Sequence, residues 1–334
     1  MTSNPWLDML TMVNGFQVTQ AISVAATLRI ADHLRDGPRS AGDLASLTNS
    51  NAGALYRLLR ALAAVGVFRE GTDRDFALTP MGDCLRTDSS TPIGGWAEHV
   101  GNPYFWQAWG HLLHSVQTGE NAFQNLHGMD VWQYRAGNPE ASAIFNRAMT
   151  NMSRGGTEAV LSAYDFSGFR HIVDVGGGQG AMLAAILSAC PNARGTLFDQ
   201  SKVVEGAEKI LHEQGVMSRC DIVGGSFFDS VPAGGDAYLM RYVIHDWEDD
   251  EAINILTVCR RAMQGSAKLL LVERSVAPPN QMPAAKFSDL NMLVAPGGRE
   301  RSREEFARLL AMAGFELARV VPAGAGNVIE ANLR

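Results

Sequence analysis

The sequence has few cysteines, and none of them is placed to bind metal or to build a disulfide framework. Four occur in 334 residues, far apart and without a CxxC pair or a Cys/His cluster; they are Cys84, Cys190, Cys220 and Cys259. This spacing argues against a structural zinc site and against a small disulfide-bonded secreted protein. We expect reduced, mostly buried thiols.

Long apolar runs are also missing. No segment contains the roughly 18 to 20 uninterrupted apolar residues that cross a bilayer. The opening residues MTSNPWLDML lack the basic start and apolar stretch of a secretion signal, so we expect a cytoplasmic protein without a membrane partner. There is no low-complexity tract, and 46% of the residues are hydrophobic, which excludes a disordered or fibrous protein.

Positive charge is scarce as well. Only four residues are lysines, and 28 basic residues stand against 35 acidic ones, which gives a formal net charge of −7. Nucleic-acid affinity depends mainly on Lys and Arg neutralising phosphates, so we expect no nucleic-acid partner. The length suits two domains of about 100 to 200 residues each.

The first hundred residues have the pattern of a small helical domain with one β-ribbon. Apolar positions at helical spacing run from Trp6 to Leu34, and further helices are predicted from Ser40 to Leu47 and after a cap at Ser50 or Asn51. Gly66 would end the last helix, and VFREGTDRDFALT then predicts a hairpin. This order is typical of a winged helix-turn-helix.

Such a module either reads DNA or serves packing and dimerisation. Residues 1–100 contain eight Arg, no Lys and ten acidic residues, whereas a DNA-reading surface should be basic. The charge balance favours dimerisation, and a transcription regulator stays as an alternative.

The following residues, to about 155, are predicted to be helical and are rich in aromatic side chains. Most of these side chains are expected in the core between helices, and some could line a ligand pocket, because apolar sites tend to form between domains. His111 and His114 stand three apart in GHLLH, but no third ligand is near them, so no metal site is predicted.

After Phe169 the patterns of strand and helix alternate. This alternation predicts a mainly parallel sheet covered on both faces. The last stretch, FELARVVPAGAGNVIEANL, predicts an antiparallel hairpin at the edge of the sheet. The candidate parallel strands begin at His171, Gly195, Asp221, Asp236 and Lys268.

The string VDVGGGQG predicts a cofactor loop between a strand and a helix. Gly176, Gly178 and Gly180 permit a tight turn and close approach of the backbone to a ligand. The spacing fits both a dinucleotide and S-adenosylmethionine, and Asp199 could hold the ribose hydroxyls of either. Asp174 favours S-adenosylmethionine, because a carboxylate attracts its cationic methionine part and repels a pyrophosphate. The terminal hairpin agrees, since a dinucleotide domain usually continues with another parallel βαβ unit.

Three ionisable residues are candidates for acid-base chemistry. His245 in RYVIHDWEDDEA follows the fourth strand, Glu273 ends the fifth, and Glu300 follows the turn APGGRE. Ligands bind at the carboxyl ends of strands in such sheets, so the three side chains could converge over one crevice. Each of them alone could equally be a core histidine or a solvated acid.

With these motifs, the chain resembles the caffeic-acid-type, plant-like O-methyltransferases and their bacterial natural-product branch over nearly its whole length. The resemblance implies a mainly helical, winged-helix-like dimerisation domain over 1–100 and a helical linker over 101–155 that lines the substrate pocket. It implies an α/β, Rossmann-like methyltransferase domain with a C-terminal antiparallel hairpin over 156–334. It further implies a homodimer formed through the N-terminal domain, and S-adenosylmethionine bound without metal.

The same resemblance assigns roles to individual residues. The HDW motif makes His245 the general base, and Glu273 and Glu300 orient it. The FNRAM segment places Phe145 and Met149 beside the ring of a small aromatic acceptor. The implied cofactor contacts are Asp174, Gly176, Gly178, Gly180, Asp199, Ser226, Phe227, Arg241, Ser153 and Trp247, and the remaining implied acceptor contacts are Trp106, Asp246 and Asn291.

One position departs from the family pattern, and one question of chemistry stays open. The usual GDxF segment is GSFF here, so Ser226 stands where an Asp contacts adenine. A phenol with a pKa near 10 must lose its proton before it attacks a methyl group, and a histidine with an ordinary pKa of about 6.5 is largely neutral and can take that proton. Relatives that bind the same cofactor but hydroxylate or cyclise leave a second reaction class open.

Overall fold

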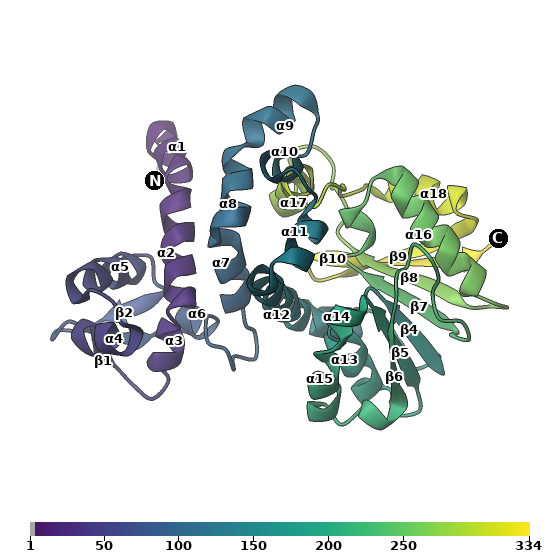
Figure 1. Ribbon diagram of the computed structural model, residues 1–334, viewed down its shortest axis with the longest axis horizontal. Coiled ribbons are helices and arrows are strands. Elements are labelled where there is room, and N and C mark those ends of the chain that lie inside the picture. The colour runs from purple at the N-terminus through teal and green to yellow at the C-terminus, as the bar shows by residue number, and fades with distance from the viewer. Residues whose placement is uncertain (1–3) are drawn as a thin grey trace. The chain divides into compact units, whose positions relative to one another are not determined.

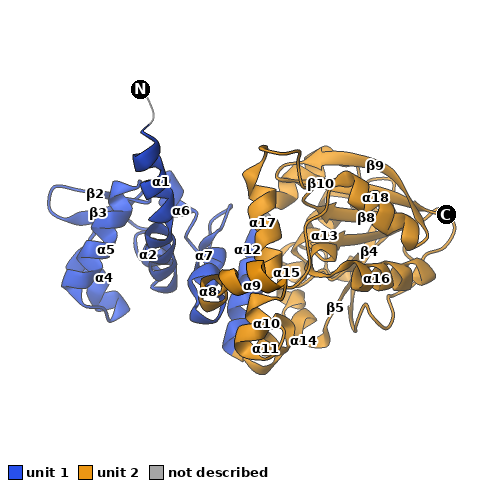
Figure 2. Cartoon of the chain, turned by 90° about the horizontal axis from the view of Figure 1, so that it is seen from above, with its two compact units in different colours: residues 1–106, 140–155 blue, residues 107–139, 156–334 orange. Residues whose placement is uncertain are grey.

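The computed structural model describes residues 4–334, and the chain divides into two compact units (Figure 2). Unit 1 contains residues 1–106 and 140–155, and unit 2 contains residues 107–139 and 156–334. These units differ from the three predicted domains, because the predicted helical linker is shared between them.

Unit 1 has the predicted order of helices followed by a hairpin. Its elements are α1 (Pro5–Val13), α2 (Gly15–Thr27), α3 (Ile30–His33), β1 (Arg39–Ser40), α4 (Ala41–Thr48), α5 (Ala52–Ala64), β2 (Phe68–Glu70), β3 (Asp75–Leu78), α6 (Pro80–Asp83), α7 (Gly94–Gly101) and the first part of α8 (Pro103–Gly110). The side chains of Ser40 and Asn51 cap α4 and α5, accepting backbone N–H bonds of 3.1 and 3.0 Å. The hairpin pairs with β1 in the order β1-β3-β2.

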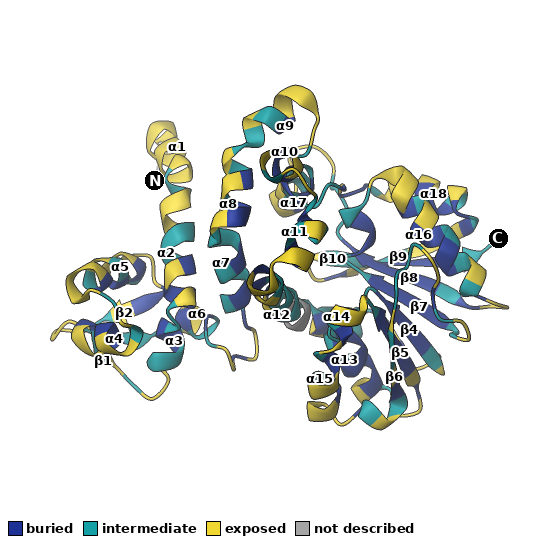
Figure 3. Cartoon of the chain, in the orientation of Figure 1, coloured by how far each residue is buried: buried dark blue, intermediate teal, exposed yellow. Residues whose placement is uncertain are grey.

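The helices of unit 1 differ sharply in burial. Leu55, Leu59 and Leu62 lie on one face of α5 and are buried in the core of the unit. In α1, by contrast, no residue is buried, and Trp6 and Met12 are 68% and 73% exposed (Figure 3). A run of exposed apolar side chains of this kind marks an interaction surface.

Unit 2 is built on a seven-stranded sheet (Figure 1). The strands are β4 (His171–Val175), β5 (Arg194–Asp199), β6 (Cys220–Gly224), β7 (Ala237–Arg241), β8 (Lys268–Glu273), β9 (Phe315–Ala323) and β10 (Gly326–Leu333). Their order is β6-β5-β4-β7-β8-β10-β9, with β4 to β8 parallel and the β9/β10 hairpin antiparallel at one edge. The predicted parallel sheet with a terminal hairpin is confirmed.

Helices cover both faces of this sheet. The helices of unit 2 are α9 (Leu112–Thr118), α10 (Ala122–His127), α11 (Val131–Gly137), α12 (Pro139–Ala163, shared with unit 1), α13 (Ala181–Ala189), α14 (Ser201–Val204), α15 (Ala207–Glu213), the 3₁₀ turns η1 (Met217–Arg219) and η2 (Ile244–Asp246), α16 (Asp249–Ala262), α17 (Pro283–Val294) and α18 (Arg303–Met312). Ile172 of β4 packs in one core with Leu183 of α13, and Val173 packs in the other with Ile255 of α16 and Phe306 of α18. Successive residues of a strand point to opposite faces, so β4 is buried on both.

Strand β7 ends earlier than the sequence predicts. The segment DAYLMRYV was expected to continue to Val243, but Tyr242 has a φ of +53°, which lies outside the strand region. The strand therefore stops at Arg241, and the chain turns into η2, whose middle residue is His245.

Within the part of the chain that the structure describes, no helix combines the length and apolar character needed to cross a membrane. The location in the cytoplasm stays a prediction.

Candidate active site

The glycine loop after β4 leaves room for a ligand beside a buried acid. Gly176, Gly178 and Gly180 have positive φ values of +70°, +61° and +82°, which other residues rarely adopt. A Cβ atom on Gly178 would meet nothing within 4 Å, so a ligand can approach the backbone there. Asp174 in β4 is 1% exposed, and neither carboxylate oxygen has a hydrogen-bond partner of normal geometry among the described residues.

This unpaired acid is the test of whether the site fits the predicted cofactor. Burial, together with nearby Asp199, raises the pKa of Asp174 to about 7, against the opposing effect of Arg241. Burying a carboxylate without hydrogen-bond partners costs free energy unless a ligand supplies those partners. The cationic amino group of S-adenosylmethionine would complete it, so the residues present fit this cofactor.

Asp199 ends β5 on the other side of the same loop. Its carboxylate accepts N–H bonds from Gly178 at 2.8 Å and from Gln200 at 2.7 Å. Burial raises the pKa of Asp199, and these two backbone bonds oppose that rise. They also fix the orientation of the carboxylate at the edge of the loop. Its contact with ribose hydroxyls stays a prediction.

Arg241 is the last residue of β7, and its side chain contacts α12. Its Nη1 atom donates to Thr157 Oγ1 at 2.9 Å and lies 3.5 Å from Met182 Sδ. Burial lowers the pKa of this guanidinium, while Asp174 favours its charge. Ser153 precedes Thr157 by one turn of α12, but its side chain lies outside the described part of the structure. Both remain predicted cofactor contacts.

The segment GSFF and the HDW tryptophan form an aromatic group. Ser226 Oγ accepts the N–H of Phe228 at 3.2 Å, so this hydroxyl closes its own turn. Phe227 and Phe228 meet Trp247 edge to face, with ring centroids 6.0 and 4.7 Å apart. Such a group suits a flat ring such as adenine, which keeps Ser226, Phe227 and Trp247 as predicted cofactor contacts.

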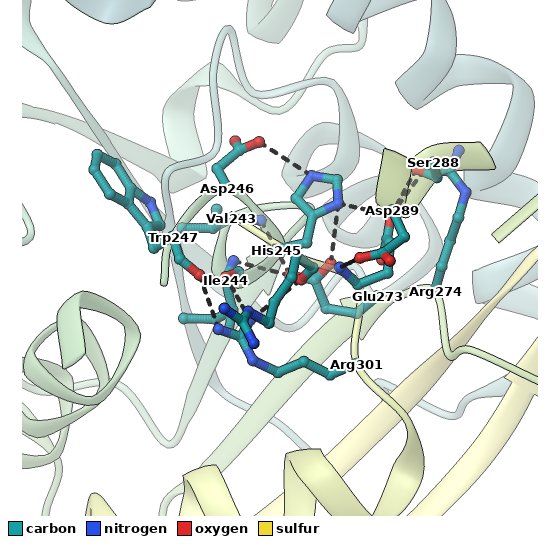
Figure 4. Close-up of polar contacts among 12 residues, drawn as sticks. Val243, Ile244, His245, Asp246, Trp247, Glu273, Arg274, Ser288, Asp289 and Arg301 are labelled. Atoms are coloured by element: carbon teal, nitrogen blue, oxygen red, sulfur yellow. Dashed lines mark hydrogen bonds and ion pairs between the residues drawn. The ribbon is translucent and has the colours of Figure 1, made fainter. Parts of the chain in front are cut away.

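His245 is held on one side by both predicted glutamates (Figure 4). It is 7% exposed, and its Nδ1 atom lies 3.0 Å from Glu300 Oε1 and 3.9 Å from Glu273 Oε2. A carboxylate can only accept a hydrogen bond, so Nδ1 carries a proton and Nε2 is the nitrogen able to take another. The structure thus brings together the three residues that the sequence proposed for acid-base chemistry.

The Nε2 side of the ring faces a third carboxyl group. Asp246 Oδ1 lies 3.5 Å from His245 Nε2. Burial raises the pKa of Asp246 to about 6, while His245 and Arg135 of α11 oppose that rise. An acceptor hydroxyl that reaches Nε2 would therefore also lie beside Asp246, in keeping with its prediction as an acceptor contact.

The charge state of His245 differs from the sequence-based expectation. Burial lowers the pKa of the imidazole, but the nearby carboxyls of Asp246, Glu273 and Glu300 raise it more strongly, to about 9. The expectation of a largely neutral histidine was therefore wrong for the ligand-free site. That expectation used the ordinary pKa of histidine, which does not include the effect of the three acids that surround the ring.

The two glutamates are shifted in opposite directions. Burial raises the pKa of Glu273 to about 7. Burial acts on Glu300 in the same sense, but hydrogen bonds from His245 and Ser288, with the charge of Arg274, hold the pKa of Glu300 below its ordinary value. Ser288 Oγ donates to Glu300 Oε1 at 2.6 Å, and Arg274 Nη1 lies 3.7 Å from the same oxygen. Glu300 is therefore the more firmly ionised partner of the base.

The donor atoms of His245, Glu273 and Glu300 all lie within 4.8 Å of one another, a spacing that a metal ion could use. Because His245 Nδ1 is already bonded to Glu300, the site is organised around a protonated nitrogen, which a metal ligand cannot keep.

The predicted acceptor residue Asn291 belongs to unit 2. Its Oδ1 atom accepts the indole N–H of Trp109 at 3.2 Å. It lies in α17, one turn beyond Ser288, so both side chains share a face of that helix. Its contact with an acceptor stays a prediction.

The other predicted acceptor residues, Trp106, Phe145 and Met149, belong to unit 1. Phe145 and Met149 lie four residues apart and so share one face of α12. The ring of Phe145 meets His99 edge to face at 5.5 Å. Their roles as acceptor contacts stay predictions.

Gly298 is a site residue that the sequence did not reveal. A Cβ atom there would overlap the backbone of His245, Asp246 and Trp247. Only glycine lets the APGGRE turn approach this closely and bring Glu300 to the imidazole. The doubled glycine was visible in the sequence, but its neighbour across the fold was not.

A cavity of about 570 Å³ opens beside α17. Phe287, Leu290 and Leu293 form its apolar wall, and it reaches Glu300, whose side chain is fully buried. Among the described residues that line it, Glu300 alone belongs to the predicted site. None of the predicted acceptor residues is among the described residues that line it.

The sheet order and the strand-end site define an α/β enzyme of the methyltransferase type. The sequence matches the O-methyltransferase domain over residues 109–316 and the O-methyltransferase dimerisation domain over residues 10–88. The first match covers more than half of the chain, and the chain belongs to the O-methyltransferase family. The resemblance and the fold class predicted from the sequence are confirmed.

Several relatives are similar over almost the whole chain. The phenazine O-methyltransferase PhzM of Lysobacter antibioticus is 43% identical over 325 residues, which cover 97% of this chain and 95% of that protein. The crystal structure of LaPhzM superposes with a TM-score of 0.96 at 41% identity, covering 99% of this chain and 100% of that one. The structure of an O-methyltransferase of neocarzinostatin biosynthesis, solved with S-adenosylmethionine and 2-hydroxy-5-methyl naphthoic acid, superposes with a TM-score of 0.79 at 33% identity. The match covers 95% of this chain and 96% of that one. The aclacinomycin 10-hydroxylase of Streptomyces purpurascens is more distant, at 34% identity over 318 residues, 93% of this chain and 85% of that protein.

Proposed function

We propose that this enzyme transfers the methyl group of S-adenosylmethionine to a hydroxyl group of a small aromatic acceptor, with His245 as the general base. The position of His245 carries the proposal. It follows β7, the parallel neighbour of β4, and β4 leads into the glycine loop beside Asp174. The carboxyl ends of neighbouring parallel strands lie at one edge of a sheet, so the base and the fitted cofactor site share that edge.

The relatives support both the reaction and the acceptor class. One is named a phenazine O-methyltransferase, and another was solved with S-adenosylmethionine and a naphthoic acid. Both acceptors are flat and aromatic. We therefore propose a hydroxylated aromatic secondary metabolite as the acceptor of this enzyme.

The residues of the chain act on the acceptor and its proton. When bound, S-adenosylmethionine supplies a methyl group on a positively charged sulfur. His245 takes the acceptor's proton at Nε2, while Glu300 holds Nδ1 and stabilises the imidazolium. Base catalysis of this kind contributes about 10² to 10⁴ in rate, whereas correct positioning contributes about 7 to 11 kcal/mol. Because tenfold in rate corresponds to about 1.4 kcal/mol, positioning of the reacting groups is the larger of the two contributions.

The raised pKa of His245 makes the imidazole a stronger base. Its pKa of about 9 lies close to that of a phenol, near 10, so proton transfer between them is nearly balanced. A phenol beside a neutral imidazole and a phenolate beside an imidazolium contain the same number of protons. The site therefore reaches its reactive state by losing one proton to solvent when the acceptor binds.

We also propose that unit 1 pairs with a second copy of the chain. Residues 10–88 match a dimerisation domain, and the apolar side chains of α1 and the start of α2 are exposed, with Met12 at 73% and Phe16 at 52%. We expect a homodimer through unit 1. The double variant Met12→Lys/Phe16→Lys should sediment as a monomer, and Met81→Lys, at an exposed position of α6, should not change the mass.

A screen of acceptors tests the reaction. Purified enzyme with S-adenosylmethionine and a set of phenazines, naphthoates and hydroxybenzoates should yield products heavier by one CH₂ group, together with S-adenosylhomocysteine. Oxidised products without S-adenosylhomocysteine would identify a hydroxylase instead.

A histidine variant tests the base. His245→Ala should lower methylation by about 10² or more, because the proton then has no acceptor, while calorimetry shows unchanged cofactor binding. His212→Ala, at an exposed position of α15, is the matched control and should behave as wild type. Equal turnover by His245→Ala and wild type would remove His245 from the reaction.

A further inference from the structure

A buried guanidinium holds the turn that carries His245. Arg301 is 1% exposed and is among the largest fully buried side chains of the chain. Its five N–H groups make five hydrogen bonds, so the charge is fully engaged. Nε and Nη2 donate to Asp249 Oδ1 at 3.0 and 2.8 Å. The remaining bonds go to the carbonyls of Ile244 at 3.0 Å, Trp247 at 2.8 Å and Arg299 at 3.4 Å (Figure 4).

Two of these carbonyls stand on either side of the catalytic histidine. Ile244 precedes His245, and Trp247 follows Asp246 at the end of η2. The carbonyl of Ile244 also accepts the backbone N–H of Trp247 at 3.3 Å, and Arg301 adds a charged donor to it and to the carbonyl of Trp247. Asp249, its carboxylate partner, begins α16. One side chain therefore ties both ends of the turn to the next helix.

Glu273 holds the same turn with a hydrogen-bond acceptor, whereas Arg301 holds it with donors. Its Oε1 atom accepts the backbone N–H of Val243 at 3.1 Å and of Ile244 at 2.9 Å. The carboxylate thus takes the N–H groups where the turn begins, and Arg301 binds the carbonyl groups that follow. Removing Glu273 would take the acceptor from two buried N–H groups, and removing Arg301 would take the charged donor from the carbonyls of Ile244 and Trp247, which is costly.

Arg301 is also the chain neighbour of Glu300. The side chain of Glu300 bonds the ring of His245, and the side chain of Arg301 bonds the backbone around it. The backbone carbonyl of Arg301 accepts the N–H of Val276 at 3.1 Å, which ties this segment to the end of β8. Consecutive residues on one strand-like segment therefore fix both the ring and the backbone of the base.

We propose that Arg301 is a positioning residue for methyl transfer, which fixes the Ile244–Trp247 backbone and so aims Nε2 of His245 at the acceptor. The inference rests on the proposed function. Its bonds reach Ile244, Trp247, Asp249 and Arg299. Of these residues Trp247 is a predicted cofactor contact, and none of the bonds reaches the glycine loop, Asp174 or Asp199. Loss of Arg301 should therefore lower kcat by a larger factor than it weakens cofactor binding.

Two substitutions at this position test the inference. Misplacing a catalytic group by about 1 Å can cost about 10²-fold in rate, so we expect about that loss of kcat in Arg301→Met. Arg301→Lys should retain an intermediate kcat, because an ammonium has three N–H donors instead of five. The break in the pH profile of kcat/KM should also move away from about 9 in Arg301→Met, since the ring leaves its acid partners. Calorimetry with S-adenosylmethionine should show, for both variants, a smaller fold change in the dissociation constant than in kcat.

A wild-type kcat and pH profile in Arg301→Met would overturn the inference. A wild type that methylates no acceptor would instead overturn the proposed function, so the two failures are distinguishable.

Two variants at exposed positions of α16 test the same inference if Arg301→Met fails to fold. Asp249 is the carboxylate partner of Arg301, and its side chain is 60% exposed. Asp249→Ala should lower kcat by about tenfold by loosening the guanidinium. Asp250→Ala removes the same charge from the first turn of α16, at an exposed position, and should keep the wild-type kcat. Equal kcat in the two variants would overturn the inference, and thermal unfolding measures their stability separately.

Discussion

His245 Nδ1 lies 3.0 Å from Glu300 Oε1, and this bond joins two positions 55 residues apart in the chain. It leaves Nε2, 3.5 Å from Asp246, as the nitrogen that can take a proton. The direction of the base is therefore decided by a residue of the loop before α18. Glu300 in turn is held by Ser288 and Arg274.

Activity should rise with pH up to about 9. Despite burial, three carboxyl groups raise the pKa of His245 to about 9, so at lower pH the imidazole is mostly protonated and cannot take a further proton. With a phenolic acceptor, kcat/KM should increase by about tenfold per pH unit below the break and then level off. Steady-state kinetics over this range measures it. A plateau that begins at the ordinary histidine pKa of about 6.5 would contradict the expectation.

The variant Glu300→Gln should move that break to lower pH. The amide removes one of the charges that raise the pKa of His245 and weakens the bond that orients the ring. The limiting rate should fall as well, because the ring is less firmly held. Glu304→Gln, at an exposed position of α18, is the matched control and should leave the profile unchanged. An unshifted break in Glu300→Gln would show that this charge does not govern the base.

Binding of S-adenosylmethionine should release protons below about pH 7. Burial, with Asp199 nearby, raises the pKa of Asp174 to about 7, so the free site is partly protonated there. A cationic ligand favours the carboxylate, so binding expels the proton and the affinity falls as the pH decreases. Calorimetry in two buffers of different ionisation enthalpy counts the protons. Asp174→Asn should bind weakly and release none, and the same release from this variant would exclude Asp174 as the source.

Gly298→Ala should damage catalysis without removing any chemical group. A methyl group there overlaps the backbone of the turn that carries His245, so the turn or the Glu300 segment must shift. A shift of about 1 Å predicts a loss of about 10² in kcat with unchanged cofactor affinity. Gly137→Ala, where the added atom meets nothing within 4 Å, is the control for the substitution itself. Wild-type kcat in Gly298→Ala would mean that the turn tolerates the displacement.

Ser226→Asp should bind the cofactor more tightly. The hydroxyl of Ser226 is occupied by the N–H of Phe228, whereas a carboxylate could accept that bond and a second one from the adenine amino group. One added hydrogen bond to a charged group contributes about 1.5 to 3 kcal/mol, which is a tenfold or larger gain in affinity. Titration calorimetry measures it, and Ser226→Ala gives the reference without either bond. An unchanged dissociation constant in Ser226→Asp would place adenine elsewhere.

Much of the fold was predictable because it depends on neighbours along the chain. Ser40 and Asn51 cap their helices through N–H groups three residues away, and the continuous burial of β4 follows from a parallel strand covered on both faces. The end of β7 was not predictable, because Tyr242 and Val243 are residues that favour strands and so continue the strand pattern. The left-handed φ of Tyr242 is imposed where the chain turns toward η2.

The residues of the candidate site could be predicted from the sequence, but the shifts of their pKa values could not. His245, Glu273 and Glu300 follow strands or a glycine turn, and parallel strands bring their ends to one edge. The opposite pKa shifts of Glu273 and Glu300 depend on which of them meets Ser288 and Arg274, and on burial that no local pattern reports.

The sequence by itself determined the family, the order of the elements, the glycine loop and the candidate base, because these are properties of short segments and their spacing. Only the tertiary structure decided that Glu300 orients His245, that Gly298 permits this approach and that Arg301 grips the turn. The physical reason is that these contacts join segments brought together by packing. Their strength, like the raised pKa of the imidazole, comes from charges held close together away from water.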